Sequence, residues 1–215
     1  MSDPDDPHRG QPVIAAGAPL NEARGAVIML HGRGANAADI IGLSGALDRP
    51  QLAYLAPEAS GHAWYPRPFM NPTAVNEPYL ASAKAVVARL IAQVEAAGIP
   101  AERVALLGFS QGACLALEYA ARHPRRYGGV LALSGGLIGE HVDATTYPGS
   151  LAGTPVLIGC SDVDPFIPLV RVQASAVVMA HLGADVTERI YPRAGHTIVA
   201  DEIGHIRRIL DLMVA

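Results

Sequence analysis

The sequence predicts an α/β fold with a mostly parallel central sheet and helices on both of its faces. Short apolar runs of strand length alternate along the chain with longer stretches whose apolar residues recur at helical spacing. Most of the short runs are apolar throughout, as strands covered on both faces are. This alternation implies parallel pairing through right-handed crossovers, which distributes the helices over both sides of one sheet.

The N-terminal half contributes two strands and two helices to this scheme. Strands are predicted at residues 26–30 and 52–56, and helices at residues 36–48 and 79–97. The two strand segments are short and apolar, whereas the two helical segments place apolar residues every three or four positions. Gly98 follows the second helical segment where a C-cap is expected.

The C-terminal half continues the same alternation. Strands are predicted at residues 103–109, 129–134, 155–160 and 186–191, and helices at residues 111–122, 168–182 and 200–214. The helix at 111–122 is rich in alanine, so it can lie close to its neighbours. Gly183 follows the helix at 168–182 where a C-cap is expected.

Length and composition indicate one compact domain. The chain has 215 residues, of which 50% are hydrophobic and 17% charged, so it can bury a large core. We expect a single domain over residues 13–215, preceded by a flexible tail at residues 1–12, where Asp and Pro dominate. The net charge of −4, without any basic run, argues against nucleic acid as a partner.

No segment has the features of a signal peptide or reaches the roughly 18 unbroken apolar residues of a transmembrane helix. We therefore expect no integral membrane segment and a cytoplasmic location. Cys114 and Cys160 lie in apolar helical and strand patterns, which is typical of buried thiols that form no disulfide. The oligomeric state is open, and a homodimer is compatible with the sequence.

One long loop interrupts the regular alternation. Residues 57–78 contain five of the 17 prolines, the only tryptophan, Trp64, and two further aromatic residues, Tyr65 and Phe69. The loop leaves the predicted sheet at the carboxyl end of a strand, which is where ligands bind in such folds. Two interpretations remain open: the aromatic residues form a pocket wall, or they cover the edge of the sheet.

The strongest local motif is Gly108-Phe109-Ser110-Gln111-Gly112, which follows an apolar strand and opens a helix. This G-x-S-x-G pattern at a strand-to-helix turn is typical of a nucleophilic serine held in a strained conformation above the sheet. Glycines flank the serine because strand and helix must approach closely there. We therefore predict Ser110 as a nucleophile.

A serine hydroxyl needs a base, and in folds with this elbow the acid and then the histidine follow the serine along the chain. His196 stands in a loop between a predicted strand and the last helix, which places it at the carboxyl edge of the sheet. The other histidines after the elbow lie in helical patterns, at a helix end or in a polar loop. We therefore predict His196 as the base.

The acid should follow the strand at 155–160, where Asp162 and Asp164 both stand. Spacing does not separate these two candidates. Asp164 precedes Pro165, which favours an extended backbone and could hold the carboxylate toward the histidine. Asp162 would then be a turn former or a group that supports the site indirectly.

A glycine-rich loop, His31-Gly32-Arg33-Gly34, directly follows the strand at 26–30. Such a loop commonly supplies one half of an oxyanion hole, and the residue after the nucleophile supplies the other half. We predict the backbone N–H groups of Arg33 and Gln111 in these roles. His31 precedes the loop and is predicted to be structural.

With these segments in view, the chain resembles the carboxylesterase/phospholipase family of α/β-hydrolases, which also includes the acyl-protein thioesterases. The resemblance begins near residue 25. It rests on Leu30-His31-Gly32 with Gly34, on residues 108–113, on Leu133-Ser134-Gly135, on Asp164-Pro165 with Pro168, and on Gly195-His196. It implies an α/β-hydrolase fold without a large lid domain and Asp164 as the acid. Arg33 departs from members that act on acylated proteins or lysophospholipids, so the chain looks closer to bacterial carboxylesterases.

The predicted function is that of a serine carboxylesterase acting on small or short-chain carboxylic esters through an acyl-enzyme on Ser110. An acyl thioesterase or lysophospholipase with the same triad is the alternative, and a non-catalytic receptor for a small ligand is a remote one. No cofactor is expected, and no metal, because no His/Cys cluster has ligand spacing. Expected pocket residues are Trp64, Tyr65, Phe69, Phe166 and Ile167.

Overall fold

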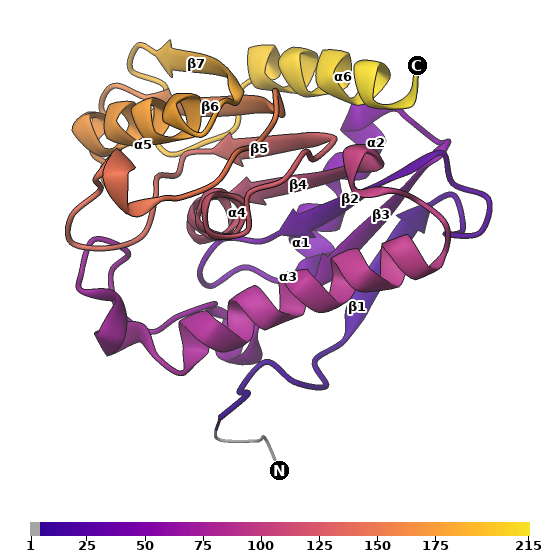
Figure 1. Cartoon of the computed structure of the whole chain (residues 1–215), viewed down its shortest axis with the longest axis horizontal. Helices are drawn as coiled ribbons and strands as arrows, with labels where there is room; N and C mark the ends of the chain where they lie inside the picture. The colour runs from indigo at the N-terminus through magenta and orange to yellow at the C-terminus, as the bar shows by residue number, and fades with distance from the viewer. Residues whose placement is uncertain (1–4) are drawn as a thin grey trace.

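The computed structural model describes residues 5–215 and contains one seven-stranded sheet in the order β1-β3-β2-β4-β5-β6-β7 (Figure 1). The strands are β1 (Val13–Gly17), β2 (Gly25–Leu30), β3 (Leu52–Pro57), β4 (Val104–Phe109), β5 (Gly129–Leu133), β6 (Pro155–Ser161) and β7 (Asp185–Tyr191). All neighbouring strands pair in parallel except β1, which is antiparallel to β3. The predicted α/β fold with a mostly parallel sheet is confirmed.

Strand β1 was not predicted. It forms one edge of the sheet, and four of its five residues are exposed, so it carries no pattern of buried apolar side chains. In contrast, β2, β3 and β5 are buried at every position. Apolar runs reveal strands that are covered on both faces, whereas an exposed edge strand gives little such signal.

Residues 5–215 contain six helices, of which five lie between strands and α6 follows the last strand. They are α1 (Ala37–Ile41), α2 (Leu43–Leu47), α3 (Tyr79–Ala96), α4 (Gln111–Arg122), α5 (Leu169–His181) and α6 (Ala200–Val214), with short 3-10 turns η1 (Ser60–His62), η2 (Thr73–Asn76), η3 (Ala101–Arg103) and η4 (Ala144–Thr146). The single helix expected at residues 36–48 is divided at Gly42 into α1 and α2. Asn36 caps α1 because its side chain accepts a hydrogen bond from the backbone N–H of Asp39 at 3.0 Å.

Two hydrophobic cores lie on the two faces of the sheet. Helices α3, α4 and α5 bury their apolar residues on one face, and α1, α2 and α6 do so on the other (Figure 1). Within residues 5–215, no helix has both the length and the apolar character needed to cross a membrane. The parallel strands direct their carboxyl ends to one edge, which is where the elbow, acid and histidine segments emerge.

The N-terminal segment differs from the flexible tail expected at residues 1–12. Its first four residues lie outside the described part of the chain, but residues 5–12 pack on the domain. His8 is 1% exposed; its Nε2 donates to the carbonyl oxygen of Trp64 at 2.9 Å, and its Nδ1 accepts from the N–H of Ser60 at 3.0 Å. For residues 5–12 the expectation of a loose tail is therefore wrong, because composition does not show that one buried histidine anchors the segment to the aromatic loop.

Candidate active site

Ser110 occupies a strained turn between β4 and α4. Its backbone has φ 55° and ψ −118°, a conformation that non-glycine residues rarely adopt. A side chain at Gly108 would overlap the backbone of Gly112, and one at Gly112 would overlap the carbonyl of Leu30. The glycines on either side are thus required by the close approach of strand and helix, and the serine is held at the carboxyl edge of the sheet.

His196 lies in the loop between β7 and α6 and faces the serine. Its Nε2 is 2.9 Å from Ser110 Oγ, although the two residues are 86 positions apart in the sequence. The imidazole lies between two aromatic rings, those of Phe109 and Phe166, with ring centroids 4.9 Å away in each case. The side chain is 17% exposed, so the surrounding rings restrict its orientation and its access to water.

Asp164 completes a continuous series of hydrogen bonds. Its Oδ2 accepts from His196 Nδ1 at 2.7 Å, and its Oδ1 accepts from the backbone N–H groups of Phe166 at 2.9 Å and Ile167 at 3.0 Å. Burial raises the pKa of Asp164, but the hydrogen bonds from His196 and the two backbone N–H groups outweigh it, so the pKa lies below its ordinary value. The carboxylate holds the proton on Nδ1 and leaves Nε2 as an acceptor toward Ser110.

Asp162, the other acid candidate, supports the histidine loop instead. Its Oδ1 accepts a hydrogen bond from the backbone N–H of Arg193 at 2.7 Å. Ser161 acts in parallel, because its Oγ accepts from the N–H of Gly195 at 3.0 Å. The sequence did not predict this role for Ser161, because no local pattern indicates a hydrogen bond between residues more than 30 positions apart. Both side chains fasten the loop that carries His196 to the end of β6.

The two predicted oxyanion donors border the same pocket as the serine. Arg33 follows β2 and Gln111 is the first residue of α4, and both line the pocket beside Ser110. Among the described residues, neither backbone N–H has a hydrogen-bond acceptor. The first N–H groups of a helix have no partner within the helix, and they carry partial positive charge. The N–H of Gln111 is such a donor, and the N–H of Arg33, in the loop after β2, also has no acceptor among the described residues, so the two groups are available to a developing negative charge.

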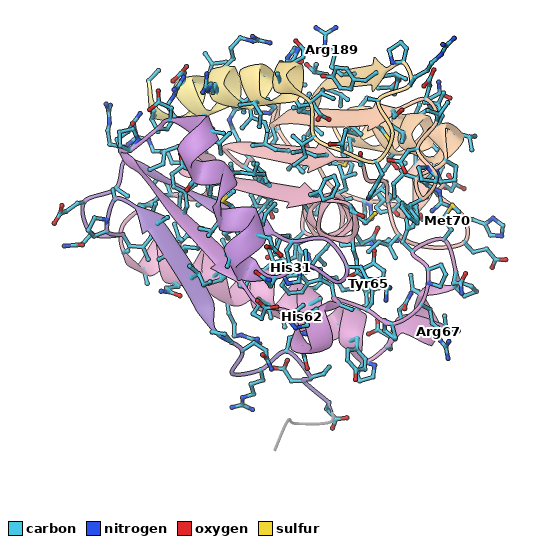
Figure 2. All side chains as sticks on the ribbon, turned by 180° about the vertical axis from the view of Figure 1, so that it is seen from behind. His31, His62, Tyr65, Arg67, Met70 and Arg189 are labelled. Atoms are coloured by element: carbon cyan, nitrogen blue, oxygen red, sulfur yellow. The ribbon has the colours of Figure 1, made fainter. Side chains whose placement is uncertain are left out.

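The side chain of Arg33 binds the aromatic loop. Its guanidinium donates to the carbonyl oxygens of Tyr65 at 2.6 Å, Pro66 at 3.2 Å and Arg67 at 3.3 Å. The guanidinium is thus bonded to the protein backbone rather than free in the solvent. In Figure 2, Tyr65 lies toward the interior of the molecule, whereas Arg67 reaches its edge.

Trp64 does not line the pocket, so its assignment as a pocket residue is wrong. Its side chain is 0% exposed and lies 5.5 Å from the ring of His8 and 5.1 Å from that of His31. Its indole N–H donates to the carbonyl oxygen of His31 at 2.9 Å. The ring therefore anchors the loop to the core, because its apolar surface and its one polar atom are both satisfied internally.

His31 is structural, as predicted. It is fully buried, its Nδ1 donates to the carbonyl oxygen of Gly32 at 2.8 Å, and its Nε2 accepts from the N–H of Ala59 at 3.1 Å. Burial lowers the pKa of His31, which keeps the ring neutral with both nitrogens bonded. Figure 2 shows His31 inside the molecule and Arg189, on β7, at a distant edge.

A pocket of about 580 Å³ opens onto Ser110 and His196. This volume lies within the roughly 300–1,000 Å³ typical of small-molecule sites. Four of the expected pocket residues line it, namely Tyr65, Phe69, Phe166 and Ile167. Within residues 5–215, no group of three His, Cys, Asp or Glu side chains is arranged to hold a metal ion.

Comparisons with known proteins bear on the family and the fold of the chain. The profile of the phospholipase/carboxylesterase family matches residues 11–214. A phospholipase/carboxylesterase from Dyadobacter fermentans has a similar crystal structure, with a TM-score of 0.90 and 45% sequence identity over 94% of this chain and 97% of that one. The crystal structure of esterase PE8 gives a TM-score of 0.76 at 25% identity, over 94% and 98% of the two chains. These similarities confirm the α/β-hydrolase fold.

Among curated proteins, acyl-protein thioesterase 1 of Gibberella zeae is 34% identical over 123 residues. The matched region is 56% of this chain and 52% of that protein. The chain spans about half the length of the curated relatives it matches.

Proposed function

Since the chain belongs to the phospholipase/carboxylesterase family, we propose that it is a serine carboxylesterase that hydrolyses small or short-chain carboxylic esters through an acyl-enzyme on Ser110. The observation that carries the proposal is the series of hydrogen bonds from Ser110 to His196, at 2.9 Å, and from His196 to Asp164, at 2.7 Å. A serine hydroxyl is a weak nucleophile until a base takes its proton. Here the base lies within hydrogen-bond distance, and a carboxylate orients it.

The reaction proceeds in two steps. Ser110 Oγ forms a bond to the carbonyl carbon while His196 Nε2 takes the hydroxyl proton. The bond between that carbon and the alcohol oxygen then breaks, and the alcohol leaves with the proton from His196. In the second step, His196 takes a proton from water while the water oxygen attacks the acyl carbon. The bond between that carbon and Ser110 Oγ then breaks, Ser110 Oγ takes the proton back from His196, and the carboxylic acid leaves. Asp164 stays ionised and stabilises the imidazolium.

The oxyanion formed in each step is stabilised by the backbone N–H groups of Arg33 and Gln111. Removing one such donor typically costs about 3–4 kcal/mol of transition-state stabilisation. Both donors border the pocket next to Ser110, and neither has an acceptor among the described residues. An incoming carbonyl oxygen can therefore accept both hydrogen bonds without breaking any existing ones.

The preference for small acyl groups follows from the walls of the pocket. Tyr65 and Phe69 are 1% and 8% exposed, and the backbone of their loop is tied to Arg33. A long acyl chain would have to displace these packed aromatic residues. A thioesterase using the same triad is the second candidate, and the similarity to an acyl-protein thioesterase favours testing it.

The test is hydrolysis of p-nitrophenyl esters with acyl chains from C2 to C16, together with an acyl thioester of matched chain length. The parent protein is compared with Ser110→Ala and with Ser44→Ala, a serine on α2 outside the pocket. We expect rapid turnover of short esters by the parent and by Ser44→Ala, and a loss of about 10⁴-fold or more in Ser110→Ala. Intact-protein mass spectrometry with a slow substrate should detect the acyl group on Ser110.

Four outcomes would contradict parts of this proposal. Turnover that survives in Ser110→Ala excludes that residue as the nucleophile. A steady rise in kcat/KM from C2 to C16 contradicts the preference for short chains, and a higher kcat/KM for the thioester supports the thioesterase candidate. Ligand binding without any turnover would favour a non-catalytic receptor.

A further inference from the structure

The chain contains three phenylalanines, and all three line the pocket at Ser110. Phe69 comes from the aromatic loop, Phe109 ends β4, and Phe166 follows β6, so they converge from separate parts of the chain. Phe69 also belongs to one hydrophobic core and Phe109 packs against the other, so both rings are held where they meet the pocket. We infer that the pocket binds an aromatic ring, and that the preferred substrates are esters with an aryl group. This inference rests on the proposed esterase function.

Two of the three rings, those of Phe109 and Phe166, contact the imidazole of His196. Phe109 lies tilted by 39° to the imidazole of His196, and Phe166 meets the same imidazole edge-on at 72°. Phe166 is 65% exposed at the rim, so a large part of its surface is free for a ligand. An aryl group bound near Ser110 would add a further ring to this cluster, in the offset or edge-to-face arrangements that aromatic pairs prefer.

The third ring, that of Phe69, is held in place by residues outside the pocket lining. The guanidinium of Arg171 lies 5.7 Å from the ring centroid, and the carbonyl oxygen of Phe69 accepts from the N–H of Gly139 at 2.8 Å. Arg171 is itself fixed because it donates to the carbonyl oxygens of Leu137 at 2.9 Å and Glu140 at 3.0 Å. The pocket therefore presents a preorganised aromatic wall, which limits the entropy lost on binding.

The charges around the pocket favour an uncharged ring. Arg33 is the one Arg or Lys among the lining residues of the described chain, and its guanidinium already donates to three loop carbonyls. No Asp or Glu lines the pocket in residues 5–215. A substrate with a free ammonium group near the ring would lose its hydration without gaining an ionic partner.

The test compares aryl esters with saturated analogues of nearly the same size and leaving-group reactivity. Benzyl acetate against cyclohexylmethyl acetate places the ring on the alcohol, and methyl phenylacetate against methyl cyclohexylacetate places it on the acid. Each aromatic pair contributes a factor of roughly two to twelve beyond burial of area. We expect kcat/KM to be about tenfold higher for the aryl member of at least one pair.

Substitutions that keep an apolar side chain then separate the aromatic contribution from size. In Phe69→Leu and Phe166→Leu, the ratio of kcat/KM for the aryl ester to kcat/KM for its cyclohexyl analogue should fall to between one and three. In Val170→Ala, which changes an exposed apolar residue outside the pocket lining, the ratio should stay near ten. An unchanged ratio in both phenylalanine variants would overturn the inference.

The result separates this inference from the esterase function. Hydrolysis of both members of each pair at equal rates would overturn the aromatic inference and leave the esterase intact. Hydrolysis of ethyl butyrate, an ester without a ring, that is faster than hydrolysis of both aryl esters would also overturn it. Failure to hydrolyse any ester at all would overturn the proposed function itself.

Discussion

The side-chain oxygen of Gln111 accepts a hydrogen bond from the backbone N–H of Trp64 at 2.9 Å. The side-chain nitrogen of the same glutamine donates to the carbonyl oxygen of Tyr65 at 2.8 Å. The residue that follows the serine thus lines the pocket beside Ser110 and also holds the aromatic loop through its side chain. The position of the loop and the geometry at Ser110 are therefore coupled.

Replacing this glutamine by methionine should weaken both activity and stability. Gln111→Met removes the two side-chain hydrogen bonds but keeps the backbone N–H. We expect kcat/KM to fall about tenfold, equivalent to about 1.4 kcal/mol. The free energy of unfolding should fall by about 1–3 kcal/mol, because the Trp64 N–H is left buried without an acceptor. Ester kinetics and urea unfolding measure these effects, with Gln173→Met, at an exposed position of α5, as the control. Parent-like values in Gln111→Met would contradict the coupling.

The two neighbouring aspartates should respond very differently to removal of their charge. Asp164→Asn leaves the size of the side chain unchanged but removes the acceptor that fixes the proton on Nδ1 of His196. We expect kcat to fall by roughly 10⁴-fold with little change in KM. Asp162→Asn alters only the bond to the histidine loop and should reduce kcat tenfold or less. If the two variants lost activity equally, Asp164 would have no special role in orienting His196.

The buried carboxyl group of Glu202 should make stability depend on pH. Glu202 is only 1% exposed, and its carboxyl group packs against Gly159. Its Oε2 accepts a hydrogen bond from the N–H of Val199 at 2.8 Å, and its Oε1 has no partner among the described residues. Burial raises the pKa of Glu202 from 4.5 to about 7. With the folded pKa above the unfolded one, its contribution to stability is fully present below pH 4.5 and is lost as the pH rises through 7.

The amide Glu202→Gln cannot ionise, so it should be more stable than the parent at pH 8 by up to about 3 kcal/mol. Between pH 4.5 and 7 this difference should shrink steadily as the pH is lowered. Urea unfolding at several pH values measures the difference, and Glu188→Gln, on an exposed position of β7, is the control. A difference that does not vary with pH would show that Glu202 ionises at its ordinary pKa.

His8 should contribute to stability mainly at neutral and alkaline pH. His8→Ala leaves the Ser60 N–H and the Trp64 carbonyl without their partner, so we expect a loss of about 2–3 kcal/mol at pH 8. Burial lowers the pKa of His8 below its ordinary 6.5. Its contribution is therefore present above pH 6.5 and is lost as the pH falls toward the folded pKa.

The measurement for His8 is the unfolding free energy of parent and variant between pH 5 and 8. The difference should narrow as the pH falls, while His141→Ala, on a side chain that is 88% exposed, should change little at any pH. A constant difference would mean that the histidine contributes only through packing. Equal stability of parent and His8→Ala would show that residues 5–12 do not anchor the loop.

Much of the fold could be read from the sequence because burial leaves a local pattern. Strands covered on both faces are continuously apolar, and helices repeat at their own period, so the five inner strands were located; the edge strand β7 was located as well, although none of its residues is buried. The elbow at Ser110 was equally visible, since its backbone strain and the contact of strand with helix demand glycines on both sides. Edge strand β1 escaped detection because its exposed positions impose no such demand.

Only the tertiary structure decided which side chains meet. The sequence placed Asp162 and Asp164 after the same strand without separating them by spacing, and the resemblance selected Asp164; folding brings Asp164 to His196 and Asp162 to the backbone of Arg193. The sequence also treated Trp64 and Tyr65 alike; packing buries both in one core, but only Tyr65 of the two also lines the pocket. Local patterns record whether a residue is buried and how the backbone turns. Contacts between segments dozens of residues apart depend instead on how all the elements pack together, which no single segment encodes.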